Sequence, residues 1–185
     1  MKIIGLVGYK GSGKTTVAKI LHDRGYIKIA FANKLKIVAK QIYNLTNEQL
    51  YGPAKDVVDD RYGITPRFIL QRLGTEVCRS IHPDTWVMDL ENTIIKTSYI
   101  KGECYVIDDV RYPNEVNLVH RLGGEVWLIN RPDLQNRDSH DSEKPELLKV
   151  DHVIENDDSI KTLTNQVFTQ LEQFHIKGEE LFNGF

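Results

Sequence analysis

Residues 8–15, Gly-Tyr-Lys-Gly-Ser-Gly-Lys-Thr, constrain the fold of this chain more than any other segment. They fit the phosphate-binding loop pattern G-x-x-x-x-G-K-[ST] at every required position. An apolar run at residues 3–7 precedes the loop and a helix-like segment follows it, so the expected order is strand, loop and helix. Glycines let backbone N–H groups point at phosphate oxygens, while Lys14 reaches the β and γ phosphates and the Thr15 hydroxyl can bind Mg²⁺. The implied ligand is a nucleoside triphosphate, most often ATP or GTP.

Length and composition predict one domain over residues 1–185, because 185 residues with 41% hydrophobic content can bury a sizeable core. The formal net charge of −2 gives no global basic field of the kind that accompanies binding to long nucleic acids. The chain has no apolar run of about 18 residues and no leader-like N-terminus, so we expect a cytoplasmic protein without membrane contact. Cys78 and Cys104 are too few for a disulfide framework.

Strand-like and helix-like segments alternate along the chain, which is typical of a parallel sheet covered on both faces. The expected fold class is α/β, a three-layer P-loop NTPase fold with about five parallel strands. Thr65-Pro66 is a helix-start signal, and Asn33 is the expected cap of an earlier helix. The expected strands are 3–7, 26–31, 103–110, 125–130 and 151–155; the expected helices are 14–24, 33–43, one from 66, one from about 83 with Trp86, Leu90, Ile94 and Ile95 on its apolar stripe, 112–122, and one from about 159.

Ligands of such sheets bind at the carboxyl ends of the strands, so catalytic groups are expected directly after strands. Asp108 and Asp109 occupy that place after an apolar run. Either acid could hold the Mg²⁺ shell or receive a proton. Because successive strand residues face opposite ways, we expect only one of them to reach the metal.

Phosphoryl transfer depends on positive charge around the moving group, because the transition state spreads negative charge over phosphate oxygens. Arginines suit this role because their guanidinium groups grip phosphates with two hydrogen bonds. The candidates are Arg67, Arg72, Arg79, Arg111, Arg131 and Arg137. Lys10, inside the loop, could be a second phosphate-binding cation or an exposed loop residue.

The polar segment 132–149, which holds two prolines, predicts a mobile lid. We expect it to close only around both nucleotides and to bring Arg131 or Arg137 onto the γ-phosphoryl group, because a site open to water would hydrolyse ATP. At the other end of the chain, the apolar residues in segment 181–185 could contact a second copy of the chain, so a homodimer is one possible assembly.

Several short motifs in a fixed order resemble those of the deoxynucleoside monophosphate kinases of tailed bacteriophages, a branch of the P-loop nucleoside monophosphate kinase fold. Besides the phosphate loop, they are Phe31-Ala32 with Leu35-Lys36, Ile64-Thr65-Pro66-Arg67, Leu70-Gln71 with Leu73-Gly74-Thr75-Glu76, Asp84 with Trp86, and Asp109-Val110-Arg111-Tyr112-Pro113-Asn114-Glu115. The resemblance covers nearly the whole chain.

The resemblance implies Mg²⁺-dependent transfer of the ATP γ-phosphoryl group to a deoxynucleoside monophosphate, giving ADP and a deoxynucleoside diphosphate for DNA synthesis. On the ATP side it implies Gly11, Ser12, Gly13, Lys14, Thr15 and Thr16, with Asn156 along the adenine, and Thr15 and Asp109 at the metal. On the acceptor side, within a helical region at about 33–100 and after the third strand, it implies Lys10, Phe31, Lys36, Arg67, Gln71, Arg72, Asp84, Trp86 and Arg111. In the lid it implies Arg137, His140 and Glu143.

Two other function classes stay open at this point. A different P-loop kinase, acting on dephospho-coenzyme A or a phosphomevalonate-like acceptor, would have a similar fold. A nucleotide-dependent switch or binding module is less favoured, because the chain has no clear Asn-Lys-x-Asp motif for reading guanine. A switch protein would also have no need for the arginines of the acceptor side, because it transfers no phosphoryl group to an acceptor.

Overall fold

The computed structural model of the protein describes residues 1–97, 103–134 and 145–183, with side chains up to residue 176 in the last range. The chain divides into two compact units, one formed by Met1–Ile29 with Lys101–Phe185 and the other by Ala30–Ile100. The second unit begins and ends close to the helical region expected at about 33–100. That the whole chain behaves as one domain stays a prediction.

In the described part of the chain, no helix is both long enough and apolar enough to cross a membrane.

A five-stranded parallel sheet forms the centre of the first unit, as the sequence predicted. Its strands lie in the order β2-β3-β1-β4-β5. Their bounds are β1 (Lys2–Val7), β2 (Tyr26–Ile29), β3 (Cys104–Ile107), β4 (Glu125–Asn130) and β5 (His152–Glu155). The predicted ends at residues 31 and 110 were too late. Edge strand β2 pairs only with the four residues of β3, and β3 ends where the polar Asp108 follows Ile107.

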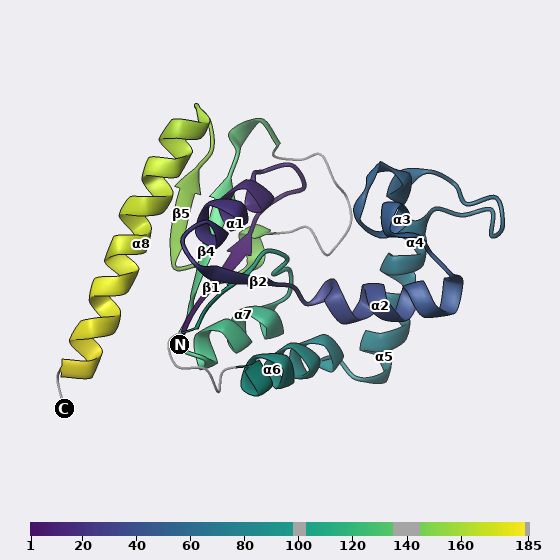
Figure 1. Cartoon of the computed structure of the whole chain (residues 1–185), viewed down its shortest axis with the longest axis horizontal. Coiled ribbons are helices and arrows are strands. Elements are labelled where there is room, and N and C mark those ends of the chain that lie inside the picture. The colour runs from purple at the N-terminus through teal and green to yellow at the C-terminus, as the bar shows by residue number, and fades with distance from the viewer. Residues whose placement is uncertain (98–102, 135–144, 184–185) are drawn as a thin grey trace. The chain divides into compact units, whose positions relative to one another are not determined.

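Helices cover both faces of this sheet (Figure 1). On one face, α1 (Lys14–His22) and α8 (Ile160–Asn183) pack on a buried cluster that includes Ile4, Leu6 and Trp127. On the opposite face, α7 (Pro113–Arg121) lies so close that a Cβ built on Gly5 would be 3.1 Å from Val119. The first unit therefore has the three layers expected from the alternating sequence pattern.

The second unit is helical. It contains α2 (Ala32–Tyr43), α3 (Asn47–Tyr51), the 3₁₀-helix η1 (Pro53–Asp56), α4 (Pro66–Gln71), the π-helix η2 (Arg72–Cys78), α5 (Arg79–Ile81) and α6 (Thr85–Thr97). The helix start at Thr65-Pro66 is confirmed, because the Thr65 hydroxyl accepts a hydrogen bond from the Phe68 N–H at 3.2 Å. Asn33 was the wrong cap: its N–H already donates to the Ala30 carbonyl, so Phe31 is the cap residue.

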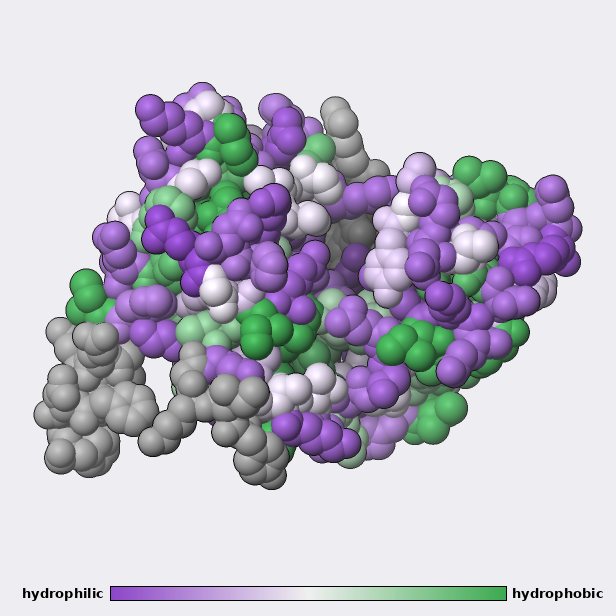
Figure 2. All heavy atoms as spheres, viewed as in Figure 1, coloured by the Kyte–Doolittle hydropathy of each residue, from purple (hydrophilic) through white to green (hydrophobic). Residues whose placement is uncertain are grey.

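Exposed apolar side chains are frequent on the second unit, and green spheres mark apolar residues on the face that Figure 2 shows. Ile95, expected on the buried stripe of α6, is half exposed, whereas Trp86, Leu90 and Ile94 are buried as expected. The other exposed members include Ile37, Ile42, Tyr51, Val57, Val58, Phe68, Val77, Ile81 and Met88. Packing in this unit therefore depends on a small set of buried residues.

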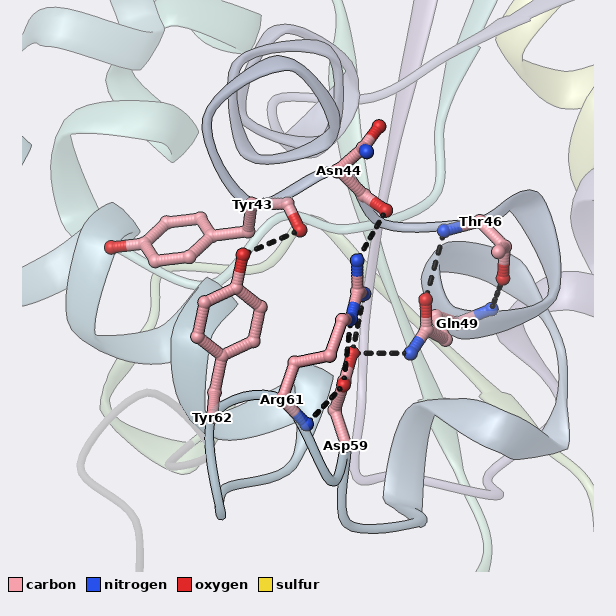
Figure 3. Close-up of polar contacts among 7 residues, drawn as sticks. All are labelled: Tyr43, Asn44, Thr46, Gln49, Asp59, Arg61 and Tyr62. Carbon is pink, nitrogen blue, oxygen red and sulfur yellow. Dashed lines mark hydrogen bonds and ion pairs between the residues drawn. The ribbon is translucent and has the colours of Figure 1, made fainter.

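An ion pair between the buried Asp59 and the exposed Arg61 joins three segments of the second unit (Figure 3). The Asp59 carboxylate accepts hydrogen bonds from Arg61 Nε at 2.9 Å, Arg61 Nη2 at 2.6 Å and Gln49 Nε2 at 2.7 Å. Arg61 Nη1 also donates to the Asn44 carbonyl, just beyond α2. The hydrogen bonds from Arg61 hold the pKa of Asp59 well below its usual range, against the opposing effect of burial.

Gln49 also belongs to the start of α3. Its N–H donates to the Thr46 hydroxyl at 3.2 Å, and its side-chain oxygen accepts from the Thr46 N–H at 2.9 Å. This reciprocal capping box fixes the side chain whose amide binds Asp59. The sequence reasoning placed no element between residues 44 and 64, although Thr46-x-x-Gln49 was a usable signal for a helix start.

We predict that Asp59→Asn lowers the urea midpoint of unfolding at neutral pH, because the Arg61 guanidinium loses its charged partner. The folded-state pKa of Asp59 lies below the unfolded value of about 3.9. Its stabilisation is therefore present above about pH 4 and is lost as the pH falls further. Circular dichroism should show the gap between wild type and variant closing on acidification. The exposed neighbour gives the control Asp60→Asn, and an equal effect of both variants would contradict the ion-pair interpretation.

Candidate functional site

The loop between β1 and α1 has a backbone that only glycine adopts readily. Gly8, Gly11 and Gly13 have φ values of 148°, 84° and 108°. A Cβ on Gly8 would also lie 2.5 Å from the Ile129 carbonyl oxygen in β4. Both conformation and space therefore require the glycines that the motif contains.

The loop leads into a helix N-terminus suited to an anion. Gly13 caps α1 without a side-chain hydrogen bond, and the first turn has no acidic residue. The positive end of the helix dipole and the first N–H groups favour a phosphate there. Ser12 Oγ, in a residue 1% exposed, has no hydrogen-bond partner among the described residues. Thr15 and Thr16 are exposed in the first turn. These features fit the triphosphate that the motif predicted.

Lys14 folds back over the loop. Its ammonium group donates to the carbonyl oxygens of Gly8 and, at 2.8 Å, of Tyr9. The lysine charge therefore lies against the backbone of the first two loop residues. A triphosphate seated in the loop would place stronger acceptors within reach of the same ammonium group.

Asn156, directly after β5, forms a hydrogen bond to the phosphate loop. Its side-chain amide donates to the Ser12 carbonyl at 2.7 Å, and its N–H donates to the Asn130 carbonyl at 2.7 Å. A Cβ on Gly13 would lie 2.5 Å from the Asn156 amide nitrogen, so this contact is a further reason for glycine. Asn156 was expected along the adenine, which stays a prediction; its contact with the loop was not foreseen.

The described ends of segment 132–149 also lie beside the loop. The Tyr9 hydroxyl donates to the Glu146 carboxylate at 2.8 Å, which raises the pKa of Tyr9. A Cβ on Gly11 would be 3.6 Å from Leu134. Lys10 and Arg131 are exposed. The predicted lid residues Arg137, His140 and Glu143 lie outside the described residues.

The two acids after β3 have different surroundings. The Asp108 carboxylate forms an ion pair with Lys28 of β2 at 2.7 Å and is 14% exposed. Asp109 is half-buried. Asp108 therefore has a positively charged partner within the first unit, and the choice of Asp109 as the acid that binds Mg²⁺ stays a prediction from the motif.

Glu115 fixes the backbone that follows these acids. Its carboxylate, in a residue 2% exposed, accepts hydrogen bonds from the N–H groups of Arg111 at 2.7 Å and Tyr112 at 3.1 Å. A glutamate at the third helical position commonly binds N–H groups at a helix start. The exposed Arg111 side chain therefore projects from a fixed turn. Glu115 is part of the motif that follows the third expected strand, and its role at this turn was not predicted.

The cations expected on the acceptor side have partners within the second unit. Arg67 forms a two-point ion pair with Asp56, its Nη2 lying 2.9 Å from the carboxylate. Arg72 pairs with Glu76. The Lys36 ammonium lies 4.4 Å from the centre of the Tyr51 ring. These contacts hold the cations in place before any ligand arrives.

The remaining acceptor-side residues differ in exposure. Phe31 and Trp86 are buried at 4% and 6% exposure, whereas Gln71 and Asp84 are half-buried. The Trp86 indole N–H donates to the Gly74 carbonyl at 3.0 Å. Trp86 is thus a packing residue of this unit, and its contact with a base stays a prediction. Among the described residues, no group of three or more His, Cys, Asp or Glu side chains could hold a metal ion.

Sheet order, phosphate loop and lysine together define a P-loop kinase fold. A solved dephospho-coenzyme A kinase of Campylobacter jejuni has the same fold, with a TM-score of 0.51, 16% identity and coverage of 97% of this chain and 100% of that one. At that identity the likeness concerns the fold alone.

The chain belongs to the deoxynucleotide monophosphate kinase family, whose model matches residues 53–167. A protein of Acanthamoeba polyphaga mimivirus, provisionally named deoxynucleotide monophosphate kinase, is 36% identical over 190 residues, which span 91% of this chain and 95% of that protein. The deoxynucleoside-5'-monophosphate kinase of Escherichia phage T5 is 29% identical over 124 residues, which span 65% of this chain and 45% of the phage protein. The family expected from the motifs is confirmed.

We predict that Asn156→Ala weakens ATP binding about threefold to tenfold, because one hydrogen bond to the loop is worth about 0.5–1.5 kcal/mol. Titration with a fluorescent ATP analogue measures this. Asn165→Ala, at an exposed position of α8, is the matched control and should bind as wild type does. Equal affinity of the Asn156 variant and wild type would mean that the loop keeps its shape without this contact.

Proposed function

We propose that this protein transfers the γ-phosphoryl group of ATP to the 5′-phosphate of a deoxynucleoside monophosphate. An acceptor phosphate oxygen forms a bond to the γ-phosphorus, and the bond from that phosphorus to the β,γ-bridging oxygen breaks. The products are ADP and a deoxynucleoside diphosphate. The observation that carries the proposal is the phosphate loop with Lys14 folded over it, in a chain of this family.

On the ATP side, the loop N–H groups and Lys14 would bind the β and γ phosphates. Lys14 would gain its strongest contacts as negative charge develops on the bridging oxygen, which lowers the barrier. Bound Mg²⁺ would neutralise phosphate charge, with the Thr15 hydroxyl and Asp109 holding it directly or through water.

On the acceptor side, Arg67, Arg72 and Arg111 would bind the monophosphate. Arginine suits this role because its planar group can donate two parallel hydrogen bonds to one phosphate. The carboxylate partners of Arg67 and Arg72 support the proposal, because cations that are already ordered lose less entropy when a ligand binds.

The deciding experiment measures ADP release with ATP and Mg²⁺ across deoxynucleoside monophosphates, ribonucleoside monophosphates, dephospho-coenzyme A and no acceptor. We expect turnover with at least one deoxynucleoside monophosphate and little ADP release without acceptor. Lys14→Ala should lose nearly all turnover, because it deletes a charge contact that strengthens in the transition state. Preferential turnover of dephospho-coenzyme A, or equal ADP release without acceptor, would refute the proposal.

The paired acids give a second, internal test. Asp109→Asn should lower kcat by about 10² or more if Asp109 organises the metal. Asp108→Asn is the matched control: it removes the same charge from the adjacent residue, and its smaller effect should come from the lost Lys28 pair. Initial rates measured over a Mg²⁺ titration distinguish the two variants. The reverse ranking would assign the metal to Asp108.

A further inference from the structure

The π-helix η2 (Arg72–Cys78) interrupts the helical run of the second unit between α4 and α5. Its hydrogen bonds join residues five apart, which is rare and occurs often at functional sites. One inserted residue rotates all later side chains by about 100° relative to a continuous α-helix. The π-helix therefore changes which of the later residues share a helix face with Arg67 and Gln71. Arg72, one of the acceptor-side candidates, stands at its start, and Glu76, the ion-pair partner of Arg72, lies within it.

Two neighbouring helices contact the π-helix at the same residue, Gly74. From α6, the buried Trp86 donates its indole N–H to the Gly74 carbonyl at 3.0 Å. From α2, Leu35 lies so close that a Cβ on Gly74 would be 2.8 Å from its Cδ2 atom. Gly74 itself is buried.

Glycine inside a helix is less stable than alanine by about 1 kcal/mol, so its presence calls for a compensating contact. The approach of Leu35 supplies one, because it needs the space where a side chain would be. Trp86 supplies the other: a buried indole N–H requires an acceptor, and a carbonyl has two lone pairs to offer. The two contacts together fix the backbone of the π-helix at Gly74.

We propose that Trp86 and Gly74 are positioning residues that hold this π-helix in place, and with it Glu76, the ion-pair partner that sets the direction of Arg72 toward the acceptor phosphate. This inference rests on the proposed function for the identity of the acceptor. In this proposal, the glycine of the Leu-Gly-Thr-Glu motif is needed for close packing. The tryptophan acts through the hydrogen bond of its ring N–H and not by stacking on a base.

Trp86→Phe tests the hydrogen bond, because phenylalanine keeps an aromatic ring but has no N–H donor. We expect the KM for the deoxynucleoside monophosphate to rise about threefold to tenfold, with the KM for ATP unchanged within about twofold. The matched control is Trp127→Phe in β4. Trp127 is also fully buried and its indole N–H donates to Glu125 at 3.1 Å. That control should lose stability while the ratio of the two KM values stays as in wild type.

Gly74→Ala tests the close approach and does not depend on removing tryptophan. It should raise the acceptor KM in the same way, and adding Leu35→Val, which removes the clashing Cδ2 atom, should restore part of the loss. Such a rescue is a coupling between the two sites that general destabilisation would not produce. An acceptor KM unchanged in both Trp86→Phe and Gly74→Ala would overturn the proposal.

Hydrogen exchange separates this inference from the proposed function. Amides of residues 72–78 should exchange faster in Trp86→Phe than in Trp127→Phe, whichever substrate the enzyme uses. If wild type phosphorylates no deoxynucleoside monophosphate, the proposed function fails while the exchange data still decide whether Trp86 holds the π-helix. Equal exchange of this segment in the two variants would overturn the positioning role.

Discussion

The turn between β1 and α1 is the constraint on which the rest of the first unit depends. Its backbone must curve inward with N–H groups toward the ligand, and glycine at three positions permits this. Two strands on the same side of β1 contact the turn. Ile129 of β4 lies against Gly8, and Asn156 after β5 holds the Ser12 carbonyl. Neighbouring strands thus determine the shape of the loop as much as its own sequence does.

Parallel pairing gives every strand the same direction, so the residues that follow them gather at one edge of the sheet. Asp109 and Arg111 follow β3, Arg131 follows β4 and Asn156 follows β5. This explains how residues far apart in sequence can serve one phosphate loop. The central strand β1 is almost entirely apolar, because it is buried on both faces, whereas the edge strands β2 and β5 expose residues such as Ile27 and Val153.

Charge in this protein is organised in local pairs rather than as an overall field, and the net charge is only −2. In the second unit, Arg67 contacts Asp56, Arg72 contacts Glu76 and Arg61 contacts the buried Asp59. Of these acids only Asp59 is buried, so the Arg67–Asp56 and Arg72–Glu76 pairs are the ones that salt screens most. A small anionic ligand can then be recognised by a few ordered cations without a basic surface that would attract nucleic acid.

The sequence by itself determined the elements whose signals are local. The phosphate loop, the cap at Thr65-Pro66 and the full extent of β4 followed from glycine spacing, capping and apolar runs, and the ordered motifs identified the family. Tertiary structure alone decided the rest. Lys28 pairs with Asp108, Asn156 reaches a loop 144 residues away, and Leu35 and Trp86 meet at Gly74. Such contacts leave no periodic trace in the sequence, because each joins residues whose proximity depends on how whole strands and helices pack.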